Sequence, residues 1–199
     1  MKGVLEGVIA SAAFSSGDRI VVGMWASSPV GPLSDVMWAD GGGVRRLLAP
    51  TAEAAAFIES VYRFDEVQIT PVHAQVRGPA LEVRAGPLEL RAQGGRARLL
   101  PWPRPRWVTR WVESPIAAAA FGVHTHGRTV HGVQEWYQAR SWRWIVWAEA
   151  TAAGSPLGGL TEFAPPARFG FSEPPRRPAL VRLRTVLIFP QGSSPHPRR

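Results

Sequence analysis

The segment Ser28-Pro29-Val30-Gly31-Pro32-Leu33-Ser34-Asp35 is the most informative part of the chain, because it sets a rigid corner between two strand-like runs. Its prolines restrict the backbone angle φ, and its glycine can adopt turn conformations that other residues avoid. Residues 19–25 before it and residues 35–39 after it are rich in the β-branched and aromatic side chains typical of strands. We therefore expect a strand, a stiff corner and a second strand, with the Asp35 carboxylate held in one direction.

Residues 31–35, Gly-Pro-Leu-Ser-Asp, resemble the Gly-Pro-Tyr-x-Glu motif of acetoacetate decarboxylase-like proteins, whose carboxylate lines the active-site cavity. Residues 47–67 are similar to the strand, short helix and return strand of that family. The resemblance implies an α+β fold, mainly antiparallel β, in which a closed or nearly closed barrel carries one clear helix. It also implies that Asp35 lines a central cavity.

The lysine that forms a Schiff base in that family has no counterpart here. The family's helix ends in Trp-Gly-Tyr/Phe-Pro-Lys, whereas residues 62–66 read Tyr-Arg-Phe-Asp-Glu and Lys2 is the only lysine. Imine formation with a keto acid requires an amine in the site. We therefore do not expect a Schiff-base decarboxylase, the sequence leaves open whether the protein is an enzyme at all, and it indicates no cofactor.

The length of 199 residues suits one domain with a substantial core. We expect residues 1–189 to form a single β-rich domain and residues 190–199, rich in Pro, Ser and Arg, to be a disordered tail. The absence of cysteine excludes disulfides, thiolate metal sites and cysteine nucleophiles. The nine tryptophans supply large side chains for a core or for the wall of a cavity.

The net charge of +8 comes almost entirely from arginine, and asparagine is absent, which is typical of a bacterial genome rich in G and C. We expect the basic residues to be solvated surface groups, so that a nucleic-acid partner is disfavoured. No run reaches membrane-spanning length and the start of the chain does not read as a signal peptide, so we expect a cytoplasmic protein without a membrane partner. The sequence leaves homo-oligomer formation open.

Periodicity predicts one helix and several strands. Thr51 can cap a helix in which residues 54, 57, 58 and 61 form a single apolar stripe. Strands are expected at 67–76 (an edge or bulge at its proline), 81–85, 88–92, 142–150 and 180–189, while residues 133–139 suit either a strand or a short helix.

Candidate site residues are carboxylates and arginines. The resemblance brings Asp35, Glu59, Asp65 and Glu66 toward one cavity, and a buried carboxylate can exchange a proton near neutral pH. Arg19 and Arg63 could pair with a ligand carboxylate. We predict ligand binding by the four residues Asp35, Arg63, Arg19 and Glu66, and Asp35 is the candidate for any acid–base catalysis.

Three histidines, His124, His126 and His131, are candidate zinc ligands because two lie on one face of a strand and the third follows a turn. A polar hairpin end is the competing interpretation, and it is the one we adopt, so no metal is expected.

Three hypotheses of function follow. The first is a protein of acetoacetate decarboxylase-like fold without the Schiff-base lysine. It would bind a small organic acid or an apolar metabolite, oriented by Asp35, with Arg63 as a second candidate. The second is a non-enzymatic barrel that binds an apolar or aromatic ligand in a tryptophan-rich cavity. The third, an arginine-rich nucleic-acid binder, rests on segments such as residues 142–144, Trp-Arg-Trp, which could stack bases.

Overall fold

The computed structural model of the chain describes residues 2–99, 126–128, 133–170 and 173–189. Within them, fourteen strands and one helix follow one another in the order β1 (Lys2–Phe14), β2 (Arg19–Ser27), β3 (Leu33–Ala39), β4 (Arg45–Ala49), α1 (Ala52–Glu59), β5 (Glu66–Ile69), β6 (Val72–Arg77), β7 (Ala80–Ala85), β8 (Leu88–Gly94), β9 (Arg98–Leu99), β10 (His126–Arg128), β11 (Gln134–Ala152), β12 (Ser155–Pro156), β13 (Leu160–Thr161) and β14 (Ala179–Ile188).

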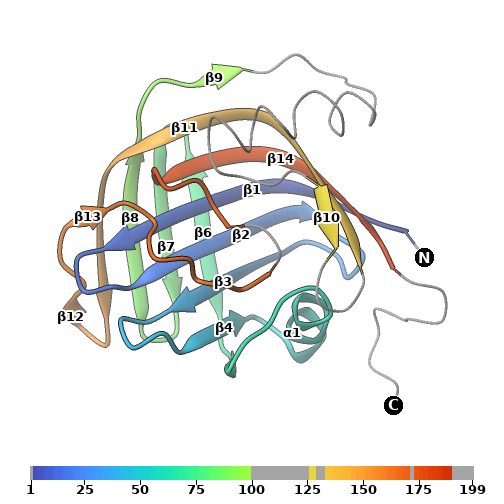
Figure 1. The fold of residues 1–199 in the computed structure, drawn as a ribbon, viewed down its shortest axis with the longest axis horizontal. Coiled ribbons are helices and arrows are strands. Elements are labelled where there is room, and N and C mark those ends of the chain that lie inside the picture. Colours follow the sequence, from blue (N-terminus) through green and yellow to red (C-terminus); the bar gives the residue numbers. More distant parts are fainter. Residues whose placement is uncertain (1, 100–125, 129–132, 171–172, 190–199) are drawn as a thin grey trace.

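The strands form one strongly curled sheet, with the order β5-β4-β3-β2-β1-β14-β11-β8-β7-β6 along its main path. Neighbouring strands are antiparallel except β4 and β5, which are parallel. Figure 1 shows β6, β7 and β8 crossing behind β1–β4, so that the curled sheet makes two layers.

The long strand β11 joins the two layers. Its first part, up to Trp144, pairs with β14, and its second part, from Ile145, pairs with β8. The register shifts between Ile145 and Trp147, and such a bulge bends a strand and increases its twist. This bend lets one strand belong to both layers.

The expected closed or nearly closed barrel is wrong, because the sheet is open. Closure would require β5 and β6, the two ends of the path, to pair, and no ladder joins them among the described strands. Pro71, between these strands, has no N–H to donate to a ladder. Figure 1 shows β6 crossing behind β1–β4. The α+β class, mainly antiparallel with one helix, is observed within the described residues.

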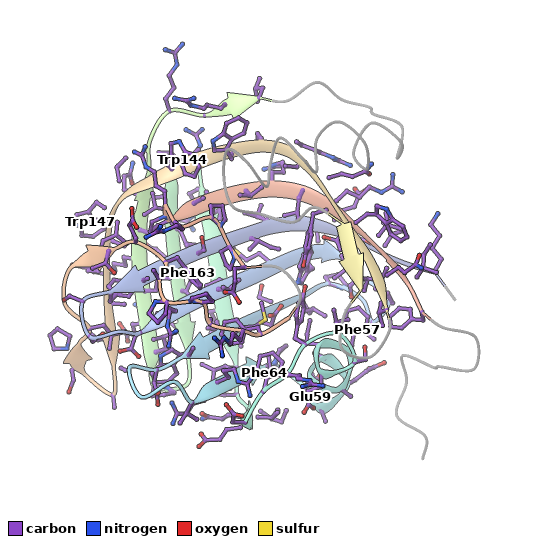
Figure 2. All side chains as sticks on the ribbon, viewed as in Figure 1. Phe57, Glu59, Phe64, Trp144, Trp147 and Phe163 are labelled. Atoms are coloured by element: carbon purple, nitrogen blue, oxygen red, sulfur yellow. The ribbon has the colours of Figure 1, made fainter. Side chains whose placement is uncertain are left out.

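Two separate hydrophobic cores lie on the two faces of β1–β4. The helix-side core packs under α1, and its large buried members are Leu5, Val21, Trp25, Leu33, Met37, Leu47, Phe57, Ile58, Val61, Val133, Phe163, Phe169, Leu187 and Phe189. The inner core fills the space between the two layers, and its large buried members are Phe14, Ile20, Val22, Val36, Trp38, Leu48, Leu81, Val83, Leu88, Leu90, Ile145, Leu157 and Leu180. Figure 2 shows Phe57 and Phe163 on the helix side of the sheet.

The predicted helix is confirmed. The Thr51 side chain accepts a hydrogen bond from the backbone N–H of Ala54 at 3.1 Å, as an N-cap does. The predicted stripe, Ala54, Phe57, Ile58 and Val61, is buried in the helix-side core.

The strand predictions also hold, with local changes of bounds. The region 67–76 divides at Pro71 into β5 and β6, and residues 134–139 are strand, not helix. The expected tail at 190–199 lies outside the described residues.

Candidate functional site

Asp35 lies in β3, within a strand that already begins at Leu33. Side chains alternate between the faces of a strand, so Asp35 shares its face with Leu33 and Met37, which belong to the helix-side core. Only 2% of Asp35 is exposed. The corner thus places a carboxyl group among hydrophobic side chains, where an unpaired charge is costly.

The turn before β3 is closed by local hydrogen bonds. The Gly31 N–H donates to the Ser28 carbonyl at 3.1 Å, and the Ser28 hydroxyl donates to the Gly31 carbonyl. Gly31 has a φ of 88°, a conformation in which glycine is favoured. Beyond this turn, β2 and β3 pair in a register that begins at Trp25 and Leu33.

That register puts Gly23 of β2 directly opposite Asp35. The Trp25 indole Nε1 donates a hydrogen bond to Asp35 Oδ1 at 3.1 Å. A Cβ atom at position 23 would lie 2.4 Å from Asp35 Oδ1 and 2.6 Å from Trp25 Nε1, so the contact occupies the space that glycine leaves. Among the described residues, Trp25 is the one hydrogen-bond donor to this carboxyl group.

Burial raises the pKa of Asp35 to about 7, although the Trp25 hydrogen bond acts in the opposite direction. Desolvation is the larger effect because it penalises the charged carboxylate. A pKa near 7 means that Asp35 can both hold and release a proton at neutral pH.

A second buried aspartate, Asp18, also accepts a hydrogen bond from an indole. Trp38 Nε1 donates to Asp18 Oδ1 at 2.6 Å, and the Ser16 hydroxyl donates to Asp18 Oδ2 at 2.6 Å. Trp38 belongs to the inner core, on the face opposite to Asp35. Both oxygens of Asp18 therefore have a donor.

Arg19, a predicted ligand-binding residue, is only 6% exposed, and its donors serve the backbone. Its guanidinium donates to the carbonyl oxygens of Gly17, Asp40, Pro165 and Pro166 at 3.1–3.2 Å. These bonds attach the 165–166 segment to the start of β2, which gives Arg19 a structural role.

The other predicted residues do not gather around Asp35. Arg63 and Glu59 are exposed, and Asp65 forms an exposed ion pair with Arg45 at 2.7 Å that lowers the pKa of Asp65 to about 2. Glu59 is the last residue of α1 (Figure 2). The predicted binding role of Arg63 has no supporting contact within the described residues.

Glu66 lines a half-open groove of about 280 Å³ with Arg46, Trp38 and Gln68. The rest of its wall comes from Pro87, between β7 and β8, and from Ala152 and Ala153 at the end of β11. Arg46 bonds to Asp40 at 2.6 Å and to Glu66 at 2.7 Å, and its guanidinium lies 5.1 Å from the centre of the Trp38 ring. The charged groups of the groove are thus paired with each other, and Asp35 does not line it.

The predicted metal ligands cannot be placed. His124 and His131 lie outside the described residues, and His126 is described only through the backbone of β10. The described side chains include no group of three or more His, Asp or Glu able to hold a metal ion. Nor does the described part of the chain contain a helix long and apolar enough to cross a membrane.

Comparison with known proteins gives a weak likeness of fold. No protein-family model matches the chain, and no curated protein matches it. The structure is similar to the crystal structure of acetoacetate decarboxylase from Legionella pneumophila, with 9% identity and a TM-score of 0.42 over 94% of this chain and 82% of that one. This is the family that residues 31–35 resemble.

Sequence reasoning missed Gly23 and Trp25, the two residues that build the environment of Asp35. Extending the Ser28–Gly31 turn as a regular hairpin would place Met24 opposite Asp35, whereas the ladder places Gly23 there. A shift of one residue moves every side chain to the other face, so the local turn does not reveal either residue.

Proposed function

We propose that this protein binds a small molecule on the helix side of the sheet, with Asp35 as the polar group that holds it. One observation carries the proposal: Asp35 is 2% exposed in a hydrophobic core, and Trp25 is its one hydrogen-bond donor among the described residues. A carboxyl group in such a place destabilises the protein unless something uses it. Binding sites are typically apolar with a few well-placed polar groups.

Asp35 suits this role better than Asp18 does. Both are buried and both accept from an indole, but Asp18 also accepts from Ser16. A structural aspartate is expected to have its oxygens satisfied inside the protein, and a binding aspartate to keep one for a ligand.

A chemical step by Asp35 would be proton transfer, since its pKa of about 7 suits an acid or a base. Imine chemistry is not proposed, because the only lysine, Lys2, is an exposed residue at the start of β1.

The groove at Trp38 supports a second candidate, binding of an apolar or aromatic ligand beside the indole. Its volume of about 280 Å³ is at the lower limit for ligand pockets. Its charged side chains already pair with one another, which leaves few groups to orient a ligand.

A thermal-shift screen of metabolites on wild type, Asp35→Asn and Asp18→Asn tests the proposal. Ligands that stabilise wild type should lose that effect in Asp35→Asn, since the change keeps the shape and removes the ionisable group, and should keep it in Asp18→Asn. Ligands that stabilise all three proteins equally would refute the Asp35 site. If their effect is lost in Trp38→Phe instead, the groove is the binding site.

A further inference from the structure

The charges around Asp35 restrict which ligand it can hold. On its face of the sheet lie the hydrophobic helix-side core and, farther along the sheet, the uncharged polar residues Ser11, Thr185 and Tyr137. Among the described residues, Arg19 is the one buried basic side chain. It lies on the same face of β2 as Gly23 but four residues away, roughly 13 Å along a strand, and its guanidinium bonds to four backbone carbonyls.

An organic acid is therefore a poor partner for this carboxyl group. A ligand carboxylate would approach Asp35 with no described cation beside it, because Arg19 is committed to the backbone and Arg63 is exposed. Two carboxylates in an apolar environment repel each other strongly, unless they share a proton.

A hydrogen-bond donor with a positive charge has the opposite effect. Asp35 Oδ1 already accepts from Trp25, and Oδ2 receives no hydrogen bond from the described residues. An ammonium group can donate to Oδ2 and balance the charge of the carboxylate at the same time. The pKa of about 7 supports this, since little free energy is needed to ionise Asp35 when a cation arrives at neutral pH.

We infer that the Asp35 site takes a small, largely apolar molecule whose polar end is a protonated amine. The inference rests on the proposed function, because it names the class of ligand for the same site. It replaces the small organic acid expected from the sequence, whose carboxylate Arg19 and Arg63 were candidates to bind.

Three probes of nearly equal size separate the possibilities: benzylamine, benzyl alcohol and benzoate. Calorimetric titrations at neutral pH use wild type, Asp35→Asn and, as a matched control on the opposite face, Asp18→Asn. Benzylamine should bind wild type more tightly than the other two probes. Loss of one charge-assisted hydrogen bond should weaken its binding about tenfold or more in Asp35→Asn, with little change in Asp18→Asn.

The other outcomes overturn either the ligand class alone or both the ligand class and the Asp35 site. If benzoate or benzyl alcohol binds wild type at least as tightly as benzylamine, and Asp35→Asn weakens it, the ligand class is wrong and the site stands. If no probe depends on Asp35, both the ligand class and the proposed site are wrong. Should Asp35→Asn fail to fold, carboxyl ¹³C NMR of labelled wild type replaces it: benzylamine must move the Asp35 signal toward the ionised form, and an unchanged signal refutes the inference.

Discussion

Two buried aspartates, Asp35 and Asp18, accept hydrogen bonds from Trp25 and Trp38, one pair on each face of the β2–β3 ladder. On the inner face, Asp18 has donors to both oxygens, and Trp38 is also covered by Arg46. On the helix side, Asp35 has one described donor and sits over a glycine. The same two residue types thus form a satisfied structural contact on one face and an incompletely satisfied carboxyl group on the other.

The largest expected difference between the two pairs is the effect of pH on stability through Asp35, which with Trp25 forms the helix-side pair. In the unfolded chain Asp35 has a pKa of about 4, and in the folded protein its pKa is about 7. Between about pH 4 and pH 7 the folded state keeps a proton that the unfolded state has released. The contribution of Asp35 to the free energy of unfolding is therefore fully present below about pH 4 and is lost as pH rises to about 7. A difference of about three pH units between the two pKa values corresponds to a change of about 4 kcal/mol in the free energy of unfolding.

Chemical denaturation at pH 4 and pH 8 measures this effect as the difference between wild type and Asp35→Asn. The variant cannot ionise, so it should gain stability relative to wild type as pH rises. A difference that does not change with pH would show that the carboxyl group is not desolvated in solution.

Asp18→Ala should lower the free energy of unfolding by about 2–4 kcal/mol. The change leaves the buried Trp38 N–H without an acceptor and deprives the Ser16 hydroxyl of its partner. Asp35→Ala at pH 8 should cost less, because it also removes an unfavourable buried carboxylate. If Asp18→Ala and Asp35→Ala lower the free energy of unfolding equally, Asp35 is as well satisfied inside the protein as Asp18.

Gly23→Ala should cost about 1–3 kcal/mol, because the new methyl group overlaps both partners of the helix-side pair. The loss should shrink when Asp35→Ala is introduced as well, since one of the overlapping groups is then gone. Denaturation of the four proteins of this double-mutant cycle measures the coupling, and strictly additive losses would contradict the close contact.

The smallest effect is expected for Glu66→Gln, which removes an ion pair with Arg46 at the rim of the groove. The Glu66 side chain is 58% exposed, so the pair should contribute below about 1 kcal/mol and less at high salt. Arg46 keeps its bond to Asp40, and therefore its position over Trp38 should persist. A loss of several kcal/mol in the free energy of unfolding would contradict this prediction, because it would show that the ion pair stabilises the fold despite its exposure.

Local patterns in the sequence predict much of this fold. The apolar stripe of α1, its cap at Thr51, the alternating strands β7 and β8 and the corner before β3 all depend on neighbours within a few residues. Asp35 could be selected for the same reason, because the corner and the strand that it begins are both local features. Such features can be predicted from the sequence, because hydrophobic periodicity and turn-forming residues depend only on neighbours a few positions away.

The chain alone determined, then, that a carboxylate follows a stiff corner into a strand. Only the tertiary structure decided what that carboxylate meets: Gly23 and Trp25 through strand register, no adjacent cation among the described residues, and Arg19 tied to the distant 165–166 segment. It also decided that the sheet stays open, because no ladder joins β5 and β6, the two ends of its path, among the described strands. The physical reason is that burial and the pKa of Asp35 depend on contacts between segments far apart in the chain, which no local pattern specifies.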